Sequence, residues 1–218
     1  MRHAATWVGL ALASALMAKD GFFAHPSAEV ADDALVGIGA KIYHQVQILP
    51  GASVGEGTIV GKGVYIDHGV MVGARAKIQN YALLYRGTVV EDEVFIGPHV
   101  VIANDTYPRA VNPDGSPKTD QDWAIKGSVI RRGASLGAAS ILLPGVEVGA
   151  NATVGAGALV ASDVPAHALV VGSPARQVGW VCVCGNRLDD ERLICRACSR
   201  AFHKVGPGLA LNDTLGRE

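Results

Sequence analysis

Four cysteines near the C-terminus have the spacing of a metal site. They are Cys182, Cys184, Cys195 and Cys198. Two close pairs separated by ten residues are typical of a zinc ribbon, because zinc prefers four thiolates around a tetrahedral centre. The first pair is Cys-x-Cys, shorter than the common Cys-x-x-Cys, so two disulfides or four free thiols stay open as alternatives. We expect a zinc-ribbon-like segment over residues 181–205 and a disordered tail over residues 206–218.

Most of the chain has a six-residue sequence repeat, and the fold that this repeat forms must position any functional site. Nineteen hexads begin with an aliphatic residue and carry a small or β-branched residue four positions later, from Val30 to Asp105 and again from Ile130 to Pro165. This period fits a short strand followed by a corner, and neither an amphipathic helix nor a long alternating strand. Three such sides close a coil of about 18 residues, and successive coils stack roughly 4.8 Å apart. We therefore predict an all-β fold, a parallel β-helix over residues 25–180.

Glycine occupies many second positions of the hexads. These glycines are Gly37, Gly55, Gly61, Gly73, Gly97, Gly137, Gly149 and Gly155. We expect turns with positive φ at these positions, because glycine adopts positive φ without steric cost.

The hexad register is lost over residues 105–124 and resumes displaced by four residues modulo six. The lost segment is rich in Pro, Gly and Asp, which predicts a loop excursion from the β-helix. Long loops inside compact domains usually carry function. A loop with a purely structural role is the alternative.

The repeat resembles that of the left-handed β-helix, or hexapeptide-repeat, acyltransferases from Val30 to about Pro174. The left hand is implied by the family. Within it, several stretches are most similar to the enzymes that N-acetylate UDP-2-acetamido-3-amino-2,3-dideoxyglucuronic acid during O-antigen and polysaccharide synthesis. These stretches are Lys77–Asn80, Val90–Pro98, Asn104–Ala110 and Ala168–Trp180. The resemblance implies an acetyltransferase that uses acetyl-CoA and a nucleotide-sugar amine, with acetylation at the 3-amino group.

The resemblance carries two catalytic roles onto this chain. Glu91 would attract the acceptor ammonium and accept a proton, and Asn104 would fix the amine through its side-chain carbonyl. A solvated corner residue at Glu91 and a turn-shaping residue at Asn104 are the structural alternatives. His68 and His99 are alternative general bases. Because residues one coil apart stack in one column, we expect Asn104 on one edge with Arg86 and His68, which lies about 10 Å away.

The resemblance also implies contacts to the acceptor and to the donor. The expected acceptor contacts are Gln79, Asn80, Tyr85, Tyr107, Arg109 and Lys126. Arg109 and Lys126 would meet the diphosphate or the uronate carboxylate, and the two tyrosines would stack on the uracil. The expected acetyl-CoA contacts are Gly137, Ala138, Ala139, Gly155, Ala156 and Arg176. The family implies a homotrimer with active sites between subunits.

The net charge and the N-terminal segment indicate which partners and which cellular location to expect. The formal charge is −1 and no basic cluster is present, so we expect no nucleic-acid partner. Residues 1–24 form an N-terminal extension whose apolar run is too short to span a bilayer. Either translation starts at Met17, or the segment is a secretory signal with an Ala13-Ser14-Ala15 cleavage site. The first alternative fits a cytoplasmic enzyme without a membrane partner.

Two other functions share this architecture. A γ-class carbonic anhydrase-like metal enzyme would need three histidines on facing edges, and His44, His68 and His99 do not reproduce the spacing of that family. A non-enzymatic scaffold would use the hexads only to support the cysteine segment.

Overall fold

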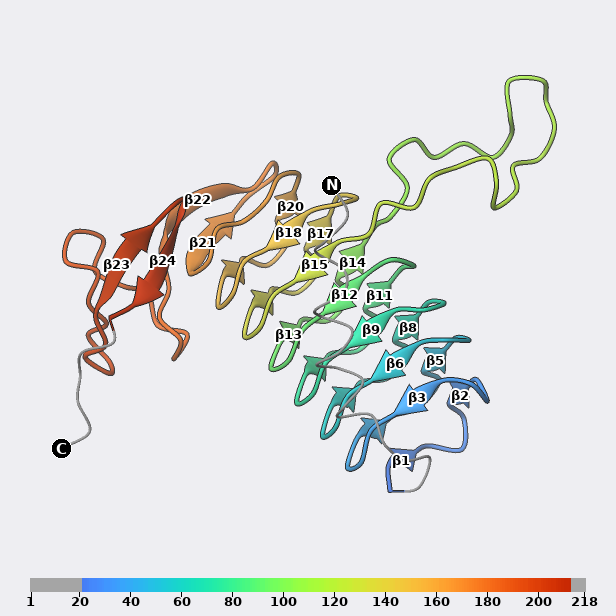
Figure 1. The fold of residues 1–218 in the computed structure, drawn as a ribbon, viewed down its shortest axis with the longest axis horizontal. Coiled ribbons are helices and arrows are strands. Elements are labelled where there is room, and N and C mark those ends of the chain that lie inside the picture. The colour runs from blue at the N-terminus through green and yellow to red at the C-terminus, as the bar shows by residue number, and fades with distance from the viewer. Residues whose placement is uncertain (1–20, 213–218) are drawn as a thin grey trace.

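Short strands separated by corners build the body of the protein. The computed structural model describes residues 21–212 (Figure 1), and it contains no helix within them. Each strand from β1 to β20 is two residues long, and from β3 onward its second residue is buried. Up to Ile102 and again from Ile130 to Val160, that second residue leads a hexad, so each hexad forms one side of the coil.

The strands line three parallel sheets, which we call sheets A, B and C. Sheet A contains β1 (Phe23–Ala24), β4 (Lys41–Ile42), β7 (Ile59–Val60), β10 (Lys77–Ile78), β13 (Phe95–Ile96), β16 (Ser135–Leu136), β19 (Thr153–Val154), β21 (Ala168–Val171) and the antiparallel β22 (Arg176–Trp180). Sheet B contains β2 (Glu29–Val30), β5 (Gln47–Ile48), β8 (Tyr65–Ile66), β11 (Leu83–Leu84), β14 (Val101–Ile102), β17 (Ile141–Leu142) and β20 (Leu159–Val160). Sheet C contains β3 (Leu35–Val36), β6 (Ser53–Val54), β9 (Met71–Val72), β12 (Val89–Val90), β15 (Val129–Ile130) and β18 (Glu147–Val148).

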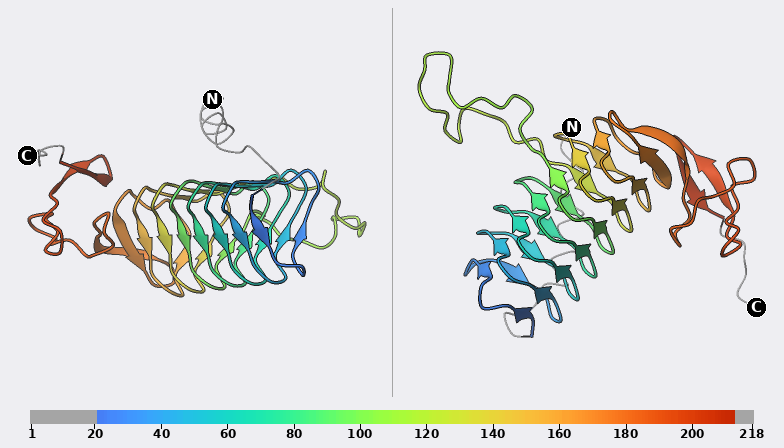
Figure 2. Two further views of the ribbon diagram at one scale, coloured as in Figure 1. Left: turned by 90° about the horizontal axis from the view of Figure 1, so that it is seen from below. Right: turned by 180° about the vertical axis from the view of Figure 1, so that it is seen from behind.

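The pairing register confirms the predicted length of the coil, three hexads per turn. Lys77 pairs with Phe95 and Ile78 with Ile96, and each parallel pair before the loop has the same separation. Ile78 and the small residue Ala82 at the following corner are both fully buried. This all-β solenoid, with its coils stacked like the steps of a ladder (Figure 2), is consistent with a left-handed β-helix.

The predicted loop leaves the coil after β14 and projects away from it (Figure 1). Met71 pairs with Val89 one regular coil later, whereas Val89 pairs with Val129, so the excursion more than doubles the length of one coil. The backbone N–H of Lys126 donates to the carbonyl of Asn104 at 3.0 Å and closes the base of the loop. The strands therefore resume their former places in the three sheets. The hexads are displaced in the sequence because the length of the loop is not a multiple of six residues.

The second-position glycines do not have positive φ, so that expectation is wrong. Positive φ occurs at the fourth position of the hexads instead, as at Gly69 with φ of 65°. At the second position the next coil comes too close for a side chain. A Cβ at Gly55 would lie 2.5 Å from the backbone N of Ala74. Those glycines are needed for the stacking of coils and not for a left-handed turn.

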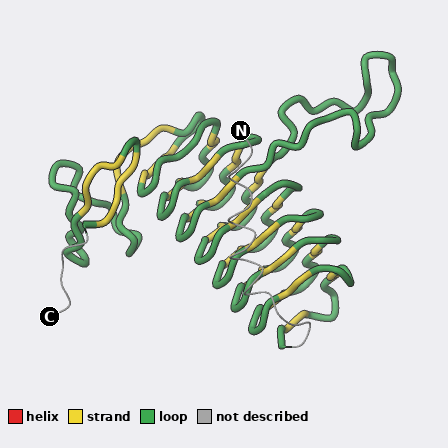
Figure 3. The backbone as a smooth tube through the Cα atoms, viewed as in Figure 1, coloured by secondary structure: helices red, strands yellow, loops and turns green. Residues whose placement is uncertain are grey.

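The C-terminal segment forms a separate small unit after the last coil (Figures 1 and 3). Strand β23 (Phe202–Val205) pairs with β24 (Gly208–Leu211) in an antiparallel hairpin. The disordered tail expected over residues 206–218 is therefore wrong for residues 208–211, because this hairpin faces a local apolar cluster with Phe202 and Leu209 buried. Residues 213–218 lie outside the described part of the chain.

The N-terminal alternatives concern residues that are not described. Met17 and the Ala13-Ser14-Ala15 motif both fall within residues 1–20. Strand β1 already pairs with β4, so the β-helix begins at Phe23, slightly before the expected residue 25. From residue 21 to residue 212, no helix has the length and apolar character needed to cross a membrane.

Candidate functional site

The three sides of the coil meet at three corners, which divide the predicted site residues into three groups. We name each corner by the sheets that it joins. The A–B corner holds Gln79 and Asn80 together with Gly137, Ala138, Ala139, Gly155 and Ala156. The B–C corner holds Tyr85 and Asn104 together with the loop that carries Tyr107, Arg109 and Lys126. The C–A corner holds Glu91. One chain therefore does not bring Glu91 and Asn104 together.

The B–C corner is suited to present side chains. Each of its second positions carries a side chain, whereas glycine dominates the same positions at the other two corners. These second positions are Ala31, Leu49, Asp67, Tyr85, Ala103, Leu143 and Ala161. The backbone of the next coil thus leaves room there for functional groups.

Asn104 lies where the coil opens into the loop. It is 9% exposed, and its Nδ2 donates to the carbonyl of Arg86 at 3.1 Å. Among residues 21–212, no donor contacts its side-chain oxygen. A nearly buried amide held at one end by the previous coil therefore offers an oriented acceptor oxygen to a ligand.

A hydrogen-bonded chain continues from Asn104 along the same corner. The backbone N–H of Arg86 donates to Asp67 Oδ2 at 3.0 Å, and Asp67 Oδ1 lies 3.0 Å from Nδ1 of His68. The Tyr65 hydroxyl donates to the same carboxylate at 3.2 Å. Burial alone would raise the pKa of Asp67, but the hydrogen bonds from His68, Arg86 and Tyr65 outweigh it and hold that pKa below its ordinary value.

The column of His68, Arg86 and Asn104 confirms the expectation from the period of the coil. The Asp67 carboxylate fixes the orientation of the His68 ring through Nδ1, and the side chain is exposed. Two coils separate His68 from Asn104, about 10 Å at the usual strand spacing. His68 is thus an oriented imidazole, but it is too far away to take a proton directly from an amine at Asn104 in the same chain.

An open groove of about 510 Å³ lies at the base of the loop. It is lined by Asp105, Thr106, Tyr107, Lys118, Asp122, Trp123, Ala124, Ile125 and Lys126. The two lysines in this lining balance the two aspartates in formal charge. The lysines offer cationic contacts, and the two aromatic rings offer stacking surfaces for a planar ring. The structure thus joins the predicted Tyr107 and Lys126 in one surface and adds Lys118 and Trp123, which the sequence reading did not select.

The position of Lys126 is fixed by the coil beneath it. A Cβ at Gly145 would overlap Cε of Lys126, so the aliphatic stem of the lysine crosses the backbone of the next coil. Tyr107 is 79% exposed, and Arg109 is also exposed, with its Nη1 donating to the carbonyl of Pro108 at 2.8 Å. The guanidinium of Arg109 therefore keeps most of its donors available for a ligand or a neighbouring molecule.

Glu91 belongs to a ladder of ion pairs along the C–A corner. Its Oε1 accepts from Arg131 Nη1 at 2.9 Å, and its Oε2 accepts from the backbone N–H of Arg132 at 2.8 Å. Arg131 also pairs with Glu147, through bonds of 2.9 and 3.0 Å. Both carboxylate oxygens of Glu91 are thus occupied in the single chain, which argues against a free proton acceptor at this position. The signal that points this way in the sequence is the pair of arginines one coil later.

The same ladder makes stability at low pH depend on Glu93. Its carboxylate accepts hydrogen bonds from Arg132 and Arg75, which lower its pKa from 4.5 to about 2. A lowered folded-state pKa means that the ion pair stabilises the fold above pH 4.5 and that this contribution is lost as the pH falls toward 2. Because the side chains are largely exposed, solvent screening keeps the effect small.

We expect Glu93→Gln to lower the Tm by about 2 °C at pH 7. The difference from the wild type should shrink as the pH is lowered from 4.5 to 2, because the wild-type carboxylate becomes protonated as the pH approaches its lowered pKa. Thermal unfolding across this pH range checks the expectation. Glu56→Gln is the control, since Glu56 lies on the same corner and its side chain has no ion pair within residues 21–212. A difference that was as large at pH 2 as at pH 7 would contradict the assignment.

The A–B corner presents backbone and small side chains in its later coils. The N–H of Gly137 donates to the carbonyl of Val154 and that of Gly157 to the carbonyl of Ala138, both at 2.8 Å. Asn80 Oδ1 accepts from the N–H of Lys62 at 2.9 Å on the same corner. Arg176 lies further on, in β22, with its Nη1 on the carbonyl of Ala175 at 2.9 Å. The predicted donor contacts thus share one corner, apart from Arg176.

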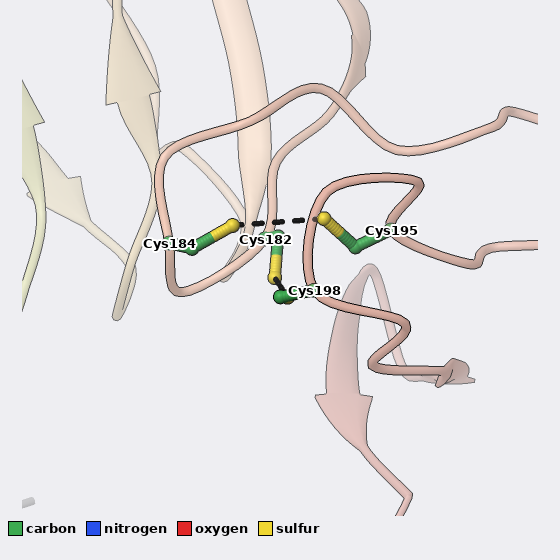
Figure 4. Close-up of side chains that lie close together, drawn as sticks. All are labelled: Cys182, Cys184, Cys195 and Cys198. Atoms are coloured by element: carbon green, nitrogen blue, oxygen red, sulfur yellow. Dashed lines mark hydrogen bonds between the residues drawn. The ribbon is translucent and has the colours of Figure 1, made fainter.

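The four cysteines converge on one point (Figure 4). Their sulfur atoms all lie within 4.8 Å of one another, with Cys182 and Cys198 at 3.4 Å and Cys184 and Cys195 at 3.6 Å. No disulfide joins them. Zinc–sulfur bonds of about 2.3 Å give tetrahedron edges of about 3.8 Å, so these four residues fit a zinc ion.

The histidines do not form a metal site within the described chain. In residues 21–212, the cysteine cluster is the only place where three or more possible ligands meet. His44 stacks on His25 with ring centroids 3.6 Å apart, and His99 stacks on Tyr81 at 5.3 Å. His68 is at a different corner from both. A three-histidine carbonic anhydrase site is therefore absent from this part of the single chain.

Comparisons with known proteins support the hexapeptide repeat. Residues 51–85 and 130–162 match the family described as hexapeptide repeat of succinyl-transferase. A dTDP-3-amino-3,6-dideoxy-α-D-galactopyranose 3-N-acetyltransferase from Aneurinibacillus thermoaerophilus is 38% identical over 81 residues, 36% of this chain and 42% of that protein. Serine acetyltransferase 4 from Arabidopsis thaliana is 49% identical over 49 residues, 22% of this chain and 14% of that protein. The chain thus spans less than half of the length of these curated relatives.

A solved structure agrees with the fold. The hexapeptide-repeat containing acetyltransferase from Vibrio cholerae O1 biovar eltor, in complex with acetyl coenzyme A, is 24% identical with a TM-score of 0.50. The match covers 60% of this chain and 70% of that one. At this level of identity the likeness supports the β-helix itself.

Proposed function

We propose, from the match of residues 51–85 and 130–162 to a hexapeptide repeat, that this chain transfers the acetyl group of acetyl-CoA to an amino group of a nucleotide-linked sugar. The observation that carries the proposal is the groove at the break in the repeat, whose lining begins at Asp105, the residue after Asn104. The similarity to a sugar 3-N-acetyltransferase supports the 3-amino group as the point of acetylation.

The groove residues have roles that match the parts of such an acceptor. Lys118 and Lys126 would contact the diphosphate, and the rings of Tyr107 and Trp123 would stack on the nucleobase. Asn104 would accept a hydrogen bond from the amine and orient its lone pair. Arg109 would bind a carboxylate on the sugar through its planar guanidinium, which favours a UDP-linked 3-amino uronic acid of the kind used in O-antigen polysaccharides.

The reaction requires a neutral amine and no covalent intermediate on the protein. After the ammonium loses a proton to water, the nitrogen lone pair attacks the thioester carbonyl carbon of acetyl-CoA. The resulting oxyanion collapses, the carbon–sulfur bond breaks, and coenzyme A leaves as the thiolate while the second nitrogen proton passes to solvent. Asn104 supplies orientation, and we assign no proton transfer to Glu91, whose two oxygens are held by Arg131 and the backbone of Arg132.

A homotrimer would complete this site. The outward residues of sheet B form an apolar column that runs through Leu83, Val101, Ile141 and Leu159. Burying such a column against neighbouring copies is favourable. Neighbours would also set the A–B corner of one copy beside another corner of the next, so that acetyl-CoA along the small residues from Gly137 to Ala156 could meet the acceptor. We also propose that the reaction takes place in the cytoplasm. Separately, we propose that the four cysteines bind a structural zinc ion.

A thiol-release assay with acetyl-CoA tests the activity. We expect turnover with 3-amino sugars linked to UDP and less with the dTDP- and GDP-linked compounds, and mass spectrometry should find the acetyl group as an amide. Arg109→Ala should raise the KM for a uronic acid acceptor by about 10-fold, because a hydrogen bond to a charged group is lost, and leave neutral sugars unchanged. Lack of turnover with every 3-amino sugar would contradict the proposed activity. Equal effects of Arg109→Ala on both sugar classes would contradict only the uronate preference.

A further inference from the structure

The last coil of the β-helix is covered by the cysteine-bearing unit. We call residues 181–212 the C-terminal module. It has its own apolar cluster, formed by Cys182, Leu188, Cys195, Phe202 and Leu209. Trp180 packs against both this cluster and the core of the β-helix. The module is thus a small second core attached to the end of the solenoid (Figure 1).

Direct contacts join the module to the turn between β20 and β21. The N–H of Val181 donates to the carbonyl of His167 at 2.8 Å, and Nδ1 of His167 lies 2.9 Å from the carbonyl of Val181. The His167 ring also packs edge-on against Phe202, with centroids 4.9 Å apart. His167 is buried, although it is a polar residue on a corner where the other coils expose theirs. Its burial is therefore explained by the module and not by the β-helix.

The hairpin of the module reaches the same turn from another direction. The N–H of Leu209 donates to the carbonyl of Ala166 at 3.2 Å. A Cβ at Gly208 would lie 3.0 Å from the N of Ala166, so the two backbones approach closely. The backbone carbonyls of Ala166 and His167 in the last coil thus both accept hydrogen bonds from the module.

An uncovered end of a β-helix can pair with other chains and cause aggregation. Its final strands have unpaired backbone groups and exposed core side chains, which other chains can pair with, and repeat proteins protect such ends with a distinct terminal unit. Here sheet A is closed by the antiparallel strand β22, which leads directly into Cys182. The module continues that protection over the turn at Ala166 and His167.

The module cannot hold this shape through its apolar cluster alone. Five buried side chains are far fewer than an independent domain needs, and units of about 30 residues usually depend on disulfides or metals. The cysteines lie at the two points that must be joined. Cys182 and Cys184 follow β22, and Cys195 and Cys198 precede β23. A cation bound by all four would fix the hairpin relative to the end of the β-helix.

We propose that a zinc ion bound by Cys182, Cys184, Cys195 and Cys198 holds the C-terminal module against Ala166 and His167 as the cap of the last coil. This inference rests on the zinc proposed above and is independent of the acetyltransferase activity. Loss of zinc would free the module, and the coil at residues 164–171 would lose its cover. The earlier coils would keep their structure, because each contacts only its neighbours.

Hydrogen–deuterium exchange on the full-length protein tests the cap. With one zinc per chain, we expect removal of zinc by a chelator to speed exchange in residues 164–171 by roughly tenfold or more, and to leave residues 41–72 unchanged. Cys184→Ser should reproduce the effect without a chelator. Val183→Ser is the matched control, since Val183 is exposed between two of the ligands and should retain both zinc and protection.

A second variant separates the cap from the metal site. His167→Ala removes the ring contacts to the carbonyl of Val181 and to Phe202, but no ligand and no backbone hydrogen bond. We therefore expect it to retain one zinc per chain and to lose protection at residues 164–171. Unchanged exchange after zinc removal and in His167→Ala would overturn the cap while leaving the zinc site intact. A protein that binds no zinc, or whose cysteines form disulfides, would overturn both. Acetyl transfer by any of these samples is a separate readout and bears on neither result.

Discussion

Asn104→Ala is expected to lower kcat/KM for acetyl transfer by about 100-fold, equivalent to about 2.7 kcal/mol of transition-state stabilisation. The side chain is nearly buried, its Nδ2 donates to the carbonyl of Arg86, and its oxygen is the acceptor that we propose for the sugar amine. Without that oxygen the amine loses its orientation toward the thioester. Steady-state kinetics with acetyl-CoA and the best nucleotide sugar measure the effect.

Two control variants separate this role from folding. Asn104→Asp retains an acceptor oxygen but sets a carboxylate oxygen against the carbonyl of Arg86, so we expect a smaller kinetic loss and a lower Tm. Asn112→Ala removes an amide at the tip of the same loop, where its Nδ2 donates to Ser116 Oγ at 3.2 Å, and should leave kcat/KM unchanged. Full activity of a folded Asn104→Ala protein would remove Asn104 from the site.

Gly55→Ala is expected to destabilise the β-helix by about 3 kcal/mol, one of the larger costs for adding a single methyl group. The new Cβ would lie 2.5 Å from the N of Ala74 and 2.6 Å from the carbonyl oxygen of Gly73. Both contacts are with backbone, so two coils must separate to relieve them. Denaturant unfolding with circular dichroism gives the free energy of unfolding.

Gly69→Ala provides the comparison for this substitution. Gly69 has φ of 65°, and a Cβ there would meet no atom within 4 Å. The cost of the variant is then limited to the left-handed conformation, about 1 kcal/mol. If Gly55→Ala cost no more than Gly69→Ala, close stacking of coils would not be the reason for glycine at the second position.

The fold was predictable because its packing rule is local. A residue such as Ile78 faces inward because of its place in the hexad, and the next coil repeats the same place with Ile96. The distribution of φ was not predictable in the same way. Both the second and the fourth positions contain glycine, for two different reasons, and composition alone does not distinguish a close backbone approach at Gly55 from a left-handed turn at Gly69.

The period of the coil predicts which residues of the candidate site share a corner. That period places His68, Arg86 and Asn104 on one corner, and hydrogen bonds through Asp67 and Arg86 now link them. Glu91 is not a whole number of coils from Asn104, so the same period places it on another corner. Its pairing with Arg131 can be read from the sequence only when the loop is left out of the count, because the loop lies between the two residues. Trp123 and Lys118 were missed because a loop has no period that shows which side chains converge.

The loop insertion also divides the β-helix into two parts that can fold separately. Most strands pair with a partner one regular coil away, whereas β12, β13 and β14 must pair with β15, β16 and β17 across the whole loop. The extra loop-closure entropy is about 0.7 kcal/mol, a small penalty at equilibrium that falls entirely on one step of assembly. We therefore expect the coils before Asn104 and those after Lys126 to nucleate separately, and to join across these three strand pairs in a later step.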